Sequence, residues 1–429
     1  MPSPPAPHVR PARGGVLVLG GGFAGSYVAR GLGRSGATIV NPTTFMLYTP
    51  ILPEAASGTL EPRHAAVGIR AMCPHAELLV GRVTGIDTDR RVAHVASDAD
   101  VWQVGYEQLV VALGAVTRLP PVPGLHEHAH GLKDLADAIA LRNHVLHQLE
   151  LADADPGSAA QRLTFVFAGA GYAGVEAIAE MHELVQEALR RHPRLRAVPQ
   201  RWLLLDAGTQ LLAQAPRRLG TYAARQLARR GIEIHSATTL TALSAGRAHL
   251  SDGTTVATET LVWTAGVQAN PLLGRLGLPL DDRGRVVVDD SLRVSGMPDV
   301  WALGDGAAVP NAATPGTCDP PTCQHALRQA RHLVRNLRRP PRPYRYKTLG
   351  QVAGLGRHHG VAVVLGVPLS GFDGWLVARV YHLLQLPGRS RRARVMADWA
   401  LARLFKRDTT ELTVLNGIGT TELAGHARV

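Results

Sequence analysis

Two stretches of the chain share one pattern: a short apolar run, the spacing Gly-x-Gly-x-x-Gly, and an amphipathic run with helical periodicity. The first is GVLVLGGGFAGSYVARGL, and the second is RLTFVFAGAGYAGVEAIAEMHELVQEALRR. Each predicts a strand, a tight turn and a helix, and the runs ATIV (37–40) and RWLLLD (201–206) supply the next strands. Two βαβ units with parallel strands follow. The predicted fold class is therefore α/β, with two Rossmann-like dinucleotide-binding domains.

The glycines of each loop have separate physical tasks. Gly20 permits the tight turn after the strand, Gly22 lets the backbone approach a pyrophosphate, and Gly25 lets the helix pack on the strand. The phosphate would then lie at the helix N-terminus, where unpaired N–H groups and the helix dipole favour an anion. The corresponding glycines of the second loop are Gly169, Gly171 and Gly174.

The residue at the end of each second strand is a candidate for binding ribose. A carboxylate is expected there, because it accepts hydrogen bonds from ribose hydroxyls. The first unit has Asn41, whose amide oxygen can accept such a bond without the charge. The second unit has Asp206, whose charge would repel a 2′-phosphate and therefore favours NAD(H). A turn-capping role for Asp206 is the alternative, and Arg217 and Arg218 leave NADP(H) open.

The order of the strands indicates that one nucleotide domain is inserted into the other. The strand in 106–115 returns to the first domain, LVWTAGV (261–267) ends the second, and VWALGDGAAVP (300–310) resumes the first. The expected parts are a disordered leader over 1–13, the first domain over 14–128, the second over 129–270, the remainder of the first over 271–340, and a C-terminal segment over 341–429.

Composition and charge limit the class of protein. Hydrophobic residues make up 45% and charged residues 19% of the 429 residues, which is typical of a globular protein with two or three domains. The net charge of +12 points to an acidic partner, either nucleic acid or anionic lipid, although an Arg-rich composition bias explains it equally well. Aromatic residues are scarce at 5%, and no recognition motif is present, so nucleic acid is not expected.

Neither a signal peptide nor a membrane-spanning run is expected. The residues before Val16 include no apolar stretch of signal-peptide length, and no run approaches the ~18 apolar residues of a spanning helix. These features predict a cytoplasmic protein, which leaves peripheral binding to a membrane open. No metal site is expected.

Several motifs are more specific than the glycine spacing. ATIVNPTTFMLYTPILPEAASGTLEPRH, GAGYAGVE, LVWTAGVQANP, WALGDGAAVP and PPTCQHALRQARHLVRNL occur in this order over about residues 14–410. In them the chain resembles the type II (non-proton-pumping) NADH dehydrogenases, which belong to the pyridine-nucleotide-dependent flavoproteins. The resemblance implies that the first domain binds FAD and the second NADH, that a quinone accepts the electrons, and that the protein lies on the inner face of the cell membrane. A homodimer is a further expectation.

The resemblance also assigns roles around the flavin. Gly304 and Asp305 match the second flavin motif, in which the Asp bonds the ribityl chain, although Gly-Asp after a strand is also an ordinary turn. Pro53 and Glu54 match a loop beside the isoalloxazine ring, with a turn carboxylate as the alternative. Further candidate cofactor contacts are Ala112 and Gly114, at a strand end where the chain crosses between domains, and Gly266.

Two residues are candidates for catalysis. Glu176 is expected in the first turn of the second nucleotide helix, where the resemblance places it facing the nicotinamide and where the helix dipole alone would also favour it. Gln324 matches the first Gln of the quinone-side motif AQxAxQ. The second Gln position is Arg328, and Gln329 is one residue along, which is about 100° of rotation on a helix. This departure puts the identity of the acceptor in doubt.

The three cysteines are too few for a disulfide framework. Disulfide reductases of this superfamily have a CxxxxC pair after the first nucleotide loop, and no cysteine lies between Gly20 and Met72. Cys318 and Cys323 have that spacing elsewhere, in a loop stiffened by two prolines. They keep a sulfide:quinone reductase as an alternative, and coincidence is the simpler interpretation.

The C-terminal third combines a basic region with an apolar stripe. No Asp or Glu occurs from Pro320 to Phe372, and a stripe of Trp375, Leu376, Val380, Leu383 and Leu384 precedes a cluster of arginines. This is typical of a helix at an anionic membrane surface, or of an amphipathic helix packed on the first domain. The leading hypothesis is a peripheral NADH:quinone oxidoreductase. The rivals are a reductase of a ferredoxin-type protein, a sulfide:quinone reductase and a non-catalytic redox sensor.

Overall fold

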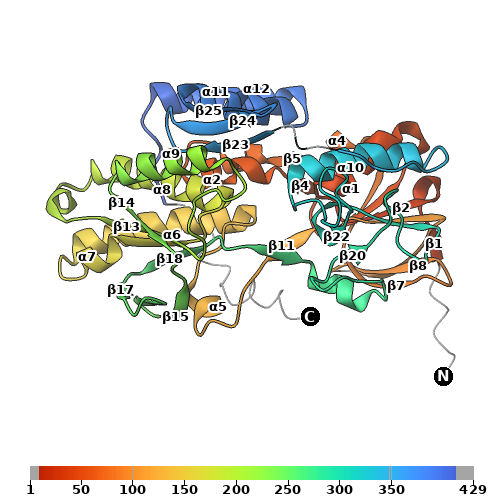
Figure 1. Cartoon of the computed structure of the whole chain (residues 1–429), viewed down its shortest axis with the longest axis horizontal. Coiled ribbons are helices and arrows are strands. Elements are labelled where there is room, and N and C mark those ends of the chain that lie inside the picture. The colour runs from red at the N-terminus through yellow and green to blue at the C-terminus, as the bar shows by residue number, and fades with distance from the viewer. Residues whose placement is uncertain (1–8, 99, 347, 349, 412–429) are drawn as a thin grey trace. The chain divides into compact units, whose positions relative to one another are not determined.

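The computed structural model describes residues 9–98, 100–346, 348 and 350–411, which form two compact units (Figure 1). Unit 1 draws on residues up to 48, 66–116 and 267–348. Unit 2 draws on 49–65, 117–266 and the residues after 348. The two compact units do not coincide with the predicted nucleotide domains, because compact units and nucleotide domains are defined differently. The predicted domain boundaries therefore remain a prediction.

Unit 1 is built around the parallel sheet that the first glycine loop predicts. Its strand order is β21 (Val300–Ala302), β10 (Gln108–Val111), β2 (Val16–Leu19), β3 (Thr38–Asn41) and β6 (Glu77–Val80), and all its neighbours are parallel. Helix α1 (Phe23–Leu32) connects β2 to β3 and packs against α10 (Cys323–Asn336). All four residues of β2 are buried, as expected for a central strand covered on both faces.

Smaller elements complete unit 1. A second sheet has the order β1 (Val9–Pro11), β9 (Val101–Gly105), β8 (Val92–Ala96) and β7 (Arg82–Asp87). The expectation of a disordered leader over 1–13 is therefore wrong for residues 9–13, because β1 pairs with β9 and a 3₁₀ turn follows; residues 1–8 lie outside the described residues. The remaining elements are β4 (Phe45–Leu47), β5 (Ala66–Gly68), α4 (Ile69–Met72), β11 (Ala115–Thr117), β19 (Val267–Ala269), β20 (Val286–Val287) and β22 (Ala307–Ala308).

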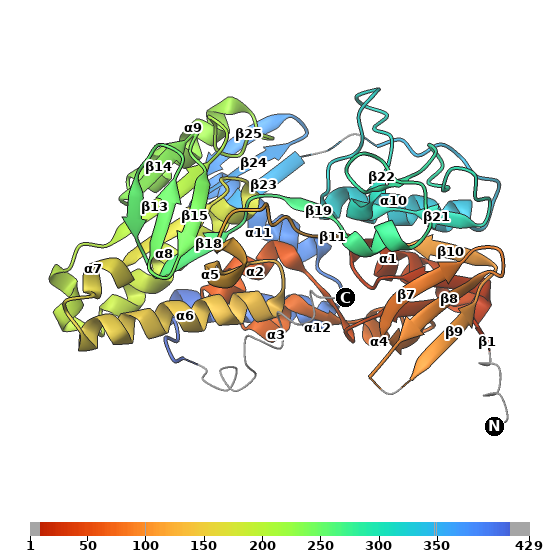
Figure 2. The ribbon, with the colours of Figure 1, turned by 90° about the horizontal axis from the view of Figure 1, so that it is seen from below.

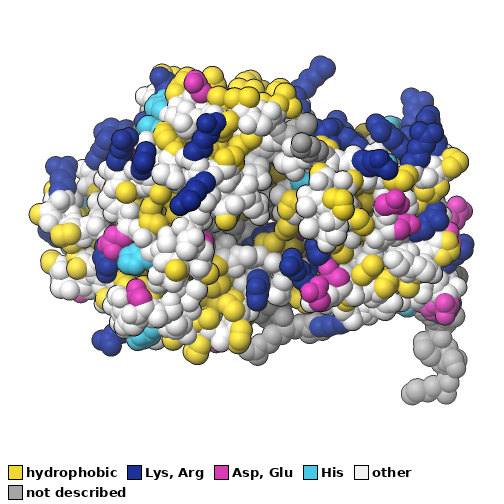
Figure 3. Space-filling model, viewed as in Figure 1, with side chains coloured by type: hydrophobic (Ala, Val, Ile, Leu, Met, Phe, Trp, Pro, Cys, Tyr) yellow, Lys and Arg dark blue, Asp and Glu magenta, His cyan; other side chains and the backbone are white. Residues whose placement is uncertain are grey.

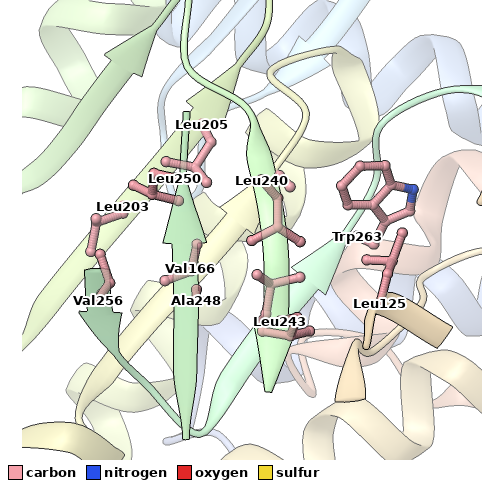
Figure 4. Close-up of a cluster of buried hydrophobic side chains, with 12 residues drawn as sticks. Leu125, Val166, Leu203, Leu205, Leu240, Leu243, Ala248, Leu250, Val256 and Trp263 are labelled. Atoms are coloured by element: carbon pink, nitrogen blue, oxygen red, sulfur yellow. The ribbon is translucent and has the colours of Figure 1, made fainter. Parts of the chain in front are cut away.

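Unit 2 contains the second parallel sheet. Its order is β14 (Ile232–Ser236), β13 (Arg201–Asp206), β12 (Thr164–Ala168) and β18 (Thr260–Trp263). One face packs against the antiparallel sheet β15 (Leu240–Ser244), β16 (Arg247–Leu250) and β17 (Thr255–Ala257). Figure 4 shows the apolar core between them, where Val166, Leu203 and Leu205 meet Leu240 and Leu250.

Helices surround this second sheet. Figure 2 shows the long helix α6 (Leu135–Ala154) running beside α2 (Leu52–Ala56) and α3 (Pro62–Ala65), both of which contact it. Helix α8 (Tyr172–Leu189) follows the glycine turn and packs against α2 and α6. The other helices of this part are α5 (Leu125–His128), α7 (Ala159–Arg162) and α9 (Arg217–Ala228).

The C-terminal part of unit 2 contains a sheet that the sequence patterns do not predict. Strands β23 (Gly350–Gly354), β24 (Gly360–Val364) and β25 (Val367–Gly371) form an antiparallel meander, and α11 (Phe372–Gln385) covers it (Figure 1). Helix α12 (Arg389–Leu404) follows after Pro387 and Gly388, which interrupt the helical run. The expected single helical segment is thus two helices behind a small sheet, and its residues 412–429 lie outside the described residues.

Candidate functional site

The two glycine turns have the same backbone geometry. Gly20 and Gly169 adopt φ of +102° and +110°, which side chains other than glycine rarely adopt. A Cβ at Gly25 would lie 1.9 Å from the carbonyl oxygen of Gly20, and one at Gly174 would lie 1.8 Å from that of Gly169. Each helix can therefore reach the end of its strand only because its third glycine has no side chain.

The N-termini of α1 and α8 are open for an anion. Their N-caps are Gly22 and Gly171, neither of which caps the helix with a side chain. A Cβ built on either glycine would meet nothing within 4 Å. The first N–H groups of each helix lack intrahelical acceptors and carry the positive end of the helix dipole, so both turns fit the pyrophosphate of a dinucleotide.

Asn41 and Asp206 take equivalent positions in the two turns. Asn41 Oδ1 accepts a hydrogen bond from Gly21 N at 2.8 Å, and Asp206 Oδ2 accepts one from Ala170 N at 2.6 Å. Asp206 Oδ1 also accepts from Gly208 N at 2.7 Å. Both side chains thus fasten the glycine loop to the next strand, a role that the sequence patterns did not indicate. Their binding of ribose remains a prediction.

The predicted flavin residues of unit 1 gather around the first turn. A Cβ on Gly20 would lie 2.3 Å from the carbonyl oxygen of Ala112, so the end of β10 lies against this turn. Gly114 and Gly304 both have positive φ, and a Cβ on Gly114 would meet open space. Asp305 follows in a 3₁₀ turn and acts electrostatically on the Cys323 thiol. The positions of these residues fit a bound FAD. The contact of each residue with FAD remains a proposal.

Gln329 has a contact that sequence reasoning missed. Its Oε1 accepts from Gly304 N at 2.8 Å, and its Nε2 donates to Asp319 at 2.9 Å, with the side chain buried. Gln324 instead accepts from the Tyr346 hydroxyl at 2.8 Å, and Arg328 lies over the Tyr346 ring. The one-residue rotation on α10 therefore directs Gln329 toward the Gly-Asp turn. The role of Gln324 toward a quinone remains a prediction.

A small cavity in unit 2 brings together residues from α2, α8, β23, α11 and α12. Its volume, taken as the space open to the centre of a water molecule, is about 30 Å³, enough for roughly two waters. Pro53, Glu54 and Glu176 line it, which places three of the predicted site residues side by side. The lining is completed by Pro50, Glu180, Gly354, Gly356, Trp375, Ala378, Arg379, His382 and Trp399.

Glu54 and Arg379 form the charged pair of this cavity. Arg379 lies 3.3 Å from Glu54, and its guanidinium carbon lies 5.1 Å and 4.4 Å from the ring centroids of Trp375 and Trp399. Trp399 Nε1 also donates to Glu54. Burial raises the pKa of Glu54, and the Arg379 charge opposes that rise. Two tryptophan rings and one carboxylate therefore fix the arginine at the cavity wall.

Glu176 has no cation of its own among the described residues. Its Oε1 accepts from Gly354 N at 2.7 Å, and burial, reinforced by the charges of Glu54 and Glu180, raises its pKa to about 8. Glu176 therefore carries a proton at neutral pH. It lies in the second turn of α8, which begins at Tyr172, so the expected first-turn position is wrong and the helix N-terminus is not what governs its charge.

Two donors of the cavity wall are buried without a partner among the described residues, Trp375 Nε1 and Arg379 Nε. A buried donor left unsatisfied costs about 1–3 kcal/mol. Together with the proton on Glu176, they suit acceptor oxygens no larger in extent than about one or two waters in this cavity. Trp375 faces this cavity and so differs from the surface position that the predicted apolar stripe gave it.

The remaining predicted residues are placed as follows. Gly266, with φ +87°, follows β18 and donates to the carbonyl of Thr264. Cys73, Cys318 and Cys323 are all free, and burial raises the pKa of the Cys323 thiol to about 12. Cys318 and Cys323 therefore form no disulfide in this structure.

Residues 14–330 match the family model of the pyridine nucleotide-disulphide oxidoreductases. The chain belongs to this family. The predicted fold class is thereby confirmed, and with it the cofactors predicted for the family, FAD and NAD(H).

Individual relatives agree with this assignment. The chain is 30% identical over 413 residues to demethylphylloquinone reductase NdbB of Synechocystis sp., covering 90% of this chain and 96% of the relative. It is also 30% identical over 423 residues to the type II NADH:quinone oxidoreductase Ndh of Mycobacterium tuberculosis, covering 92% and 89%. The fold matches that of NDH2 from Plasmodium falciparum, solved in complex with NADH, with a TM-score of 0.86 at 17% identity over 94% and 100% of the two chains. The resemblance to type II NADH dehydrogenases is therefore confirmed.

A pair of glycine substitutions separates packing from phosphate binding in this family member. Gly25→Ala should lower the free energy of unfolding by about 2 kcal/mol or more, because the new Cβ would meet the Gly20 backbone. Gly22→Ala should leave stability within about 0.5 kcal/mol and reduce the bound flavin, because its Cβ would fill the open space at the helix end. Thermal denaturation and flavin content of the purified proteins measure the two effects. Full flavin content in Gly22→Ala would contradict the phosphate-binding role.

The raised pKa of Glu176 predicts that the free energy of unfolding depends on pH. Its pKa in the folded state is raised, so the stability that its proton provides is present at low pH and is lost as pH rises through about 8. Between about pH 6 and pH 9, the wild type should lose roughly 3 kcal/mol more than Glu176→Gln, which is neutral throughout. Urea denaturation at each pH measures this, with exposed Glu150→Gln as the control. Equal losses in the wild type and Glu176→Gln would show that Glu176 is ionised at neutral pH.

Proposed function

We propose that this chain is a FAD-dependent NADH:quinone oxidoreductase that moves no protons across the membrane. The observation that supports it best is the pair of open glycine turns together with a carboxyl-lined cavity that contains the buried Glu176. Two relatives that match nearly the whole chain are named as quinone reductases, and this supports a quinone as the electron acceptor. The absence of a second Gln in the AQxAxQ pattern leaves the particular quinone open.

Each part of the chain has a separate task in this reaction. The turn at Gly20–Gly25, with Asp305, would bind FAD, and the turn at Gly169–Gly174, with Asp206, would bind NADH. When bound, FAD accepts a hydride from NADH and passes two electrons to the quinone. NADH, one proton and a quinone give NAD⁺ and a quinol, so the chain must deliver a proton. Glu176 holds one in the cavity, and neighbouring donors of the wall can orient an acceptor oxygen there.

Two of the three cysteines are poorly suited to a competing thiol route. Burial raises the pKa of the Cys73 thiol to about 11 and that of Cys323 to about 12, so neither is a thiolate at neutral pH. Helix α1, which follows the first turn, contains no cysteine. Electron transfer in this chain therefore needs no protein disulfide, which disfavours the disulfide and sulfide alternatives.

The surface of α11 and α12 supports binding to an anionic membrane, and binding from the cytoplasmic side is part of the proposal. Figure 3 shows hydrophobic side chains gathered over these helices, and Phe372, Leu376, Val380 and Leu384 form an exposed stripe at four-residue spacing. Among the described residues, no helix combines the length and apolar character that crossing a bilayer requires. Apolar side chains flanked by exposed cations suit the headgroup region, where each cation contributes about 1 kcal/mol. The exposed cations are Arg389, Arg394, Arg403 and Lys406. A homodimer remains a prediction.

The flavin of the purified protein reports the first reaction step. NADH should bleach its absorbance, and menadione should restore the colour, because hydride enters and two electrons leave through the same group. NADPH should bleach it more slowly, because Asp206 repels a 2′-phosphate. An absorbance spectrum after each addition tests this. A flavin that NADH does not bleach would contradict the proposed function.

Membrane binding is expected to depend on the exposed apolar side chains of α11 and α12. Replacing both Leu384 and Leu404, which are 60% and 75% exposed, by Glu should lower binding to vesicles containing anionic lipid by about tenfold or more. Val101→Glu, at a side chain 71% exposed on β9, is the matched control and should bind like the wild type. Cosedimentation measures the bound fraction. Unchanged binding of the double variant would rule out this surface as the main contact.

A further inference from the structure

Helix α8 presents three carboxyl groups on one face. Glu176, Glu180 and Glu183 follow at spacings of four and three residues, which places them one above another along the helix. Glu180 shares the cavity lining with Glu176, and its side chain is only 8% exposed. Neither Glu180 nor Glu183 has a task in the proposed reaction.

The chain segment that follows α12 supplies a cation, Arg407, for Glu180 and Glu183. Arg407 Nη2 lies 3.2 Å from Glu180 Oε2 and 2.8 Å from Glu183 Oε2, and Nη1 donates to the backbone oxygen of Glu180 at 3.2 Å. The Arg407 side chain is 6% exposed. A charge buried this completely persists only with partners of opposite charge.

Helix α6 and the end of α8 fix the position of this segment. Arg142 of α6 donates to the backbone oxygens of Asp408 and Thr410, the latter at 3.2 Å. Arg191, just after α8, donates to the Thr409 hydroxyl at 2.6 Å. Arg407 is therefore held at its partners by contacts on its C-terminal side, and its position does not depend on the ion pairs alone.

Glu180 is paired with Arg407 and also acts electrostatically on Glu176. Ser57 and Thr59 donate to Glu180 Oε2 at 2.6 Å and 2.9 Å. Burial opposes ionisation of Glu180, but the Arg407 charge and these hydrogen bonds outweigh it and hold its pKa below the usual value. Arg407 is not among the described residues that line the cavity. The charge of Glu180 acts on Glu176, whereas the charge of Arg407 is not among the causes that shift the Glu176 pKa.

We propose that Arg407 is a positioning residue that sets the charge of the cavity: it keeps Glu180 ionised, and the fixed charge of Glu180 adds to burial and to the charge of Glu54 in holding the proton on Glu176. The use of that proton for quinone reduction rests on the proposed function, whereas the coupling of the three side chains does not. Other groups that face them are Tyr172 and Glu183 on α8, Glu54 on α2, Arg379 and His382 on α11, Arg230 after α9 and Arg357 after β23.

The test follows the proton on Glu176 directly. In flavin-loaded protein without NADH or quinone, infrared difference spectra between pH steps should show the protonated carboxyl band that Glu176→Gln lacks, with a midpoint near 8. Arg407→Gln leaves Glu180 without its cation, so Glu180 should take up a proton and the Glu176 midpoint should fall by roughly one pH unit. Arg407→Lys retains the charge and should keep the wild-type midpoint.

Two further variants keep the result interpretable. Glu180→Gln/Arg407→Gln removes the buried pair together, so it should fold even if Arg407→Gln does not, and its midpoint should also fall. Arg403→Gln removes an exposed arginine of α12 and should leave the midpoint unchanged. A wild-type midpoint in Arg407→Gln, or in the double variant, would overturn the proposal. Because this readout involves no quinone, a shifted midpoint in a protein that fails to reduce quinones would count against the proposed function alone.

Discussion

A helix can point its free N–H groups at a phosphate only if it begins close to the end of the preceding strand, and a missing Cβ permits this in both units. Gly25 and Gly174 provide that closeness, and positive φ at Gly20 and Gly169 turns the chain. Asn41 and Asp206 then fasten each loop from the next strand. The same backbone solution is thus supported by a neutral amide in one unit and by a carboxylate in the other. In the second unit the residue that holds the loop, Asp206, also brings a carboxylate to the turn.

The cavity of unit 2 depends on a balance between buried carboxyl groups and the arginines that pair with them. Three carboxyl groups line it or lie at its edge, and two arginines accompany them, Arg379 at Glu54 and Arg407 at Glu180. One carboxyl is left over, and Glu176 stays neutral by retaining its proton. Both arginines come from the C-terminal part of the chain, which also provides the exposed apolar stripe. The elements that meet a membrane in the proposed function therefore also determine the electrostatics next to the second nucleotide helix.

Local patterns allowed the sequence to predict the parallel sheets and both glycine turns. A buried strand, a glycine spacing and an amphipathic helix each leave a periodic signal within about twenty residues. The pairing of Glu180 with Arg407 leaves none, because the partners are 227 residues apart and each alone resembles an ordinary surface charge. The sheet β23–β25 was missed because its short strands are rich in glycine and lie inside a basic region. The rotation of Gln329 on α10 indicates that its side chain points away from that of Arg328. Its partner, the backbone N–H of Gly304, leaves no signal in the sequence.

Unit 2 combines three separated stretches of chain, and this has a consequence for its biosynthesis. A ribosome releases α8 with its buried carboxyl groups long before it releases Arg407. Until then, the helix lacks the cation that offsets their burial, and β23 cannot yet cover Glu176. Contacts between distant parts of a chain also form more slowly than local ones. The unit is therefore expected to remain partly folded during much of translation and to close in a late step, once α12 and the residues after it have emerged.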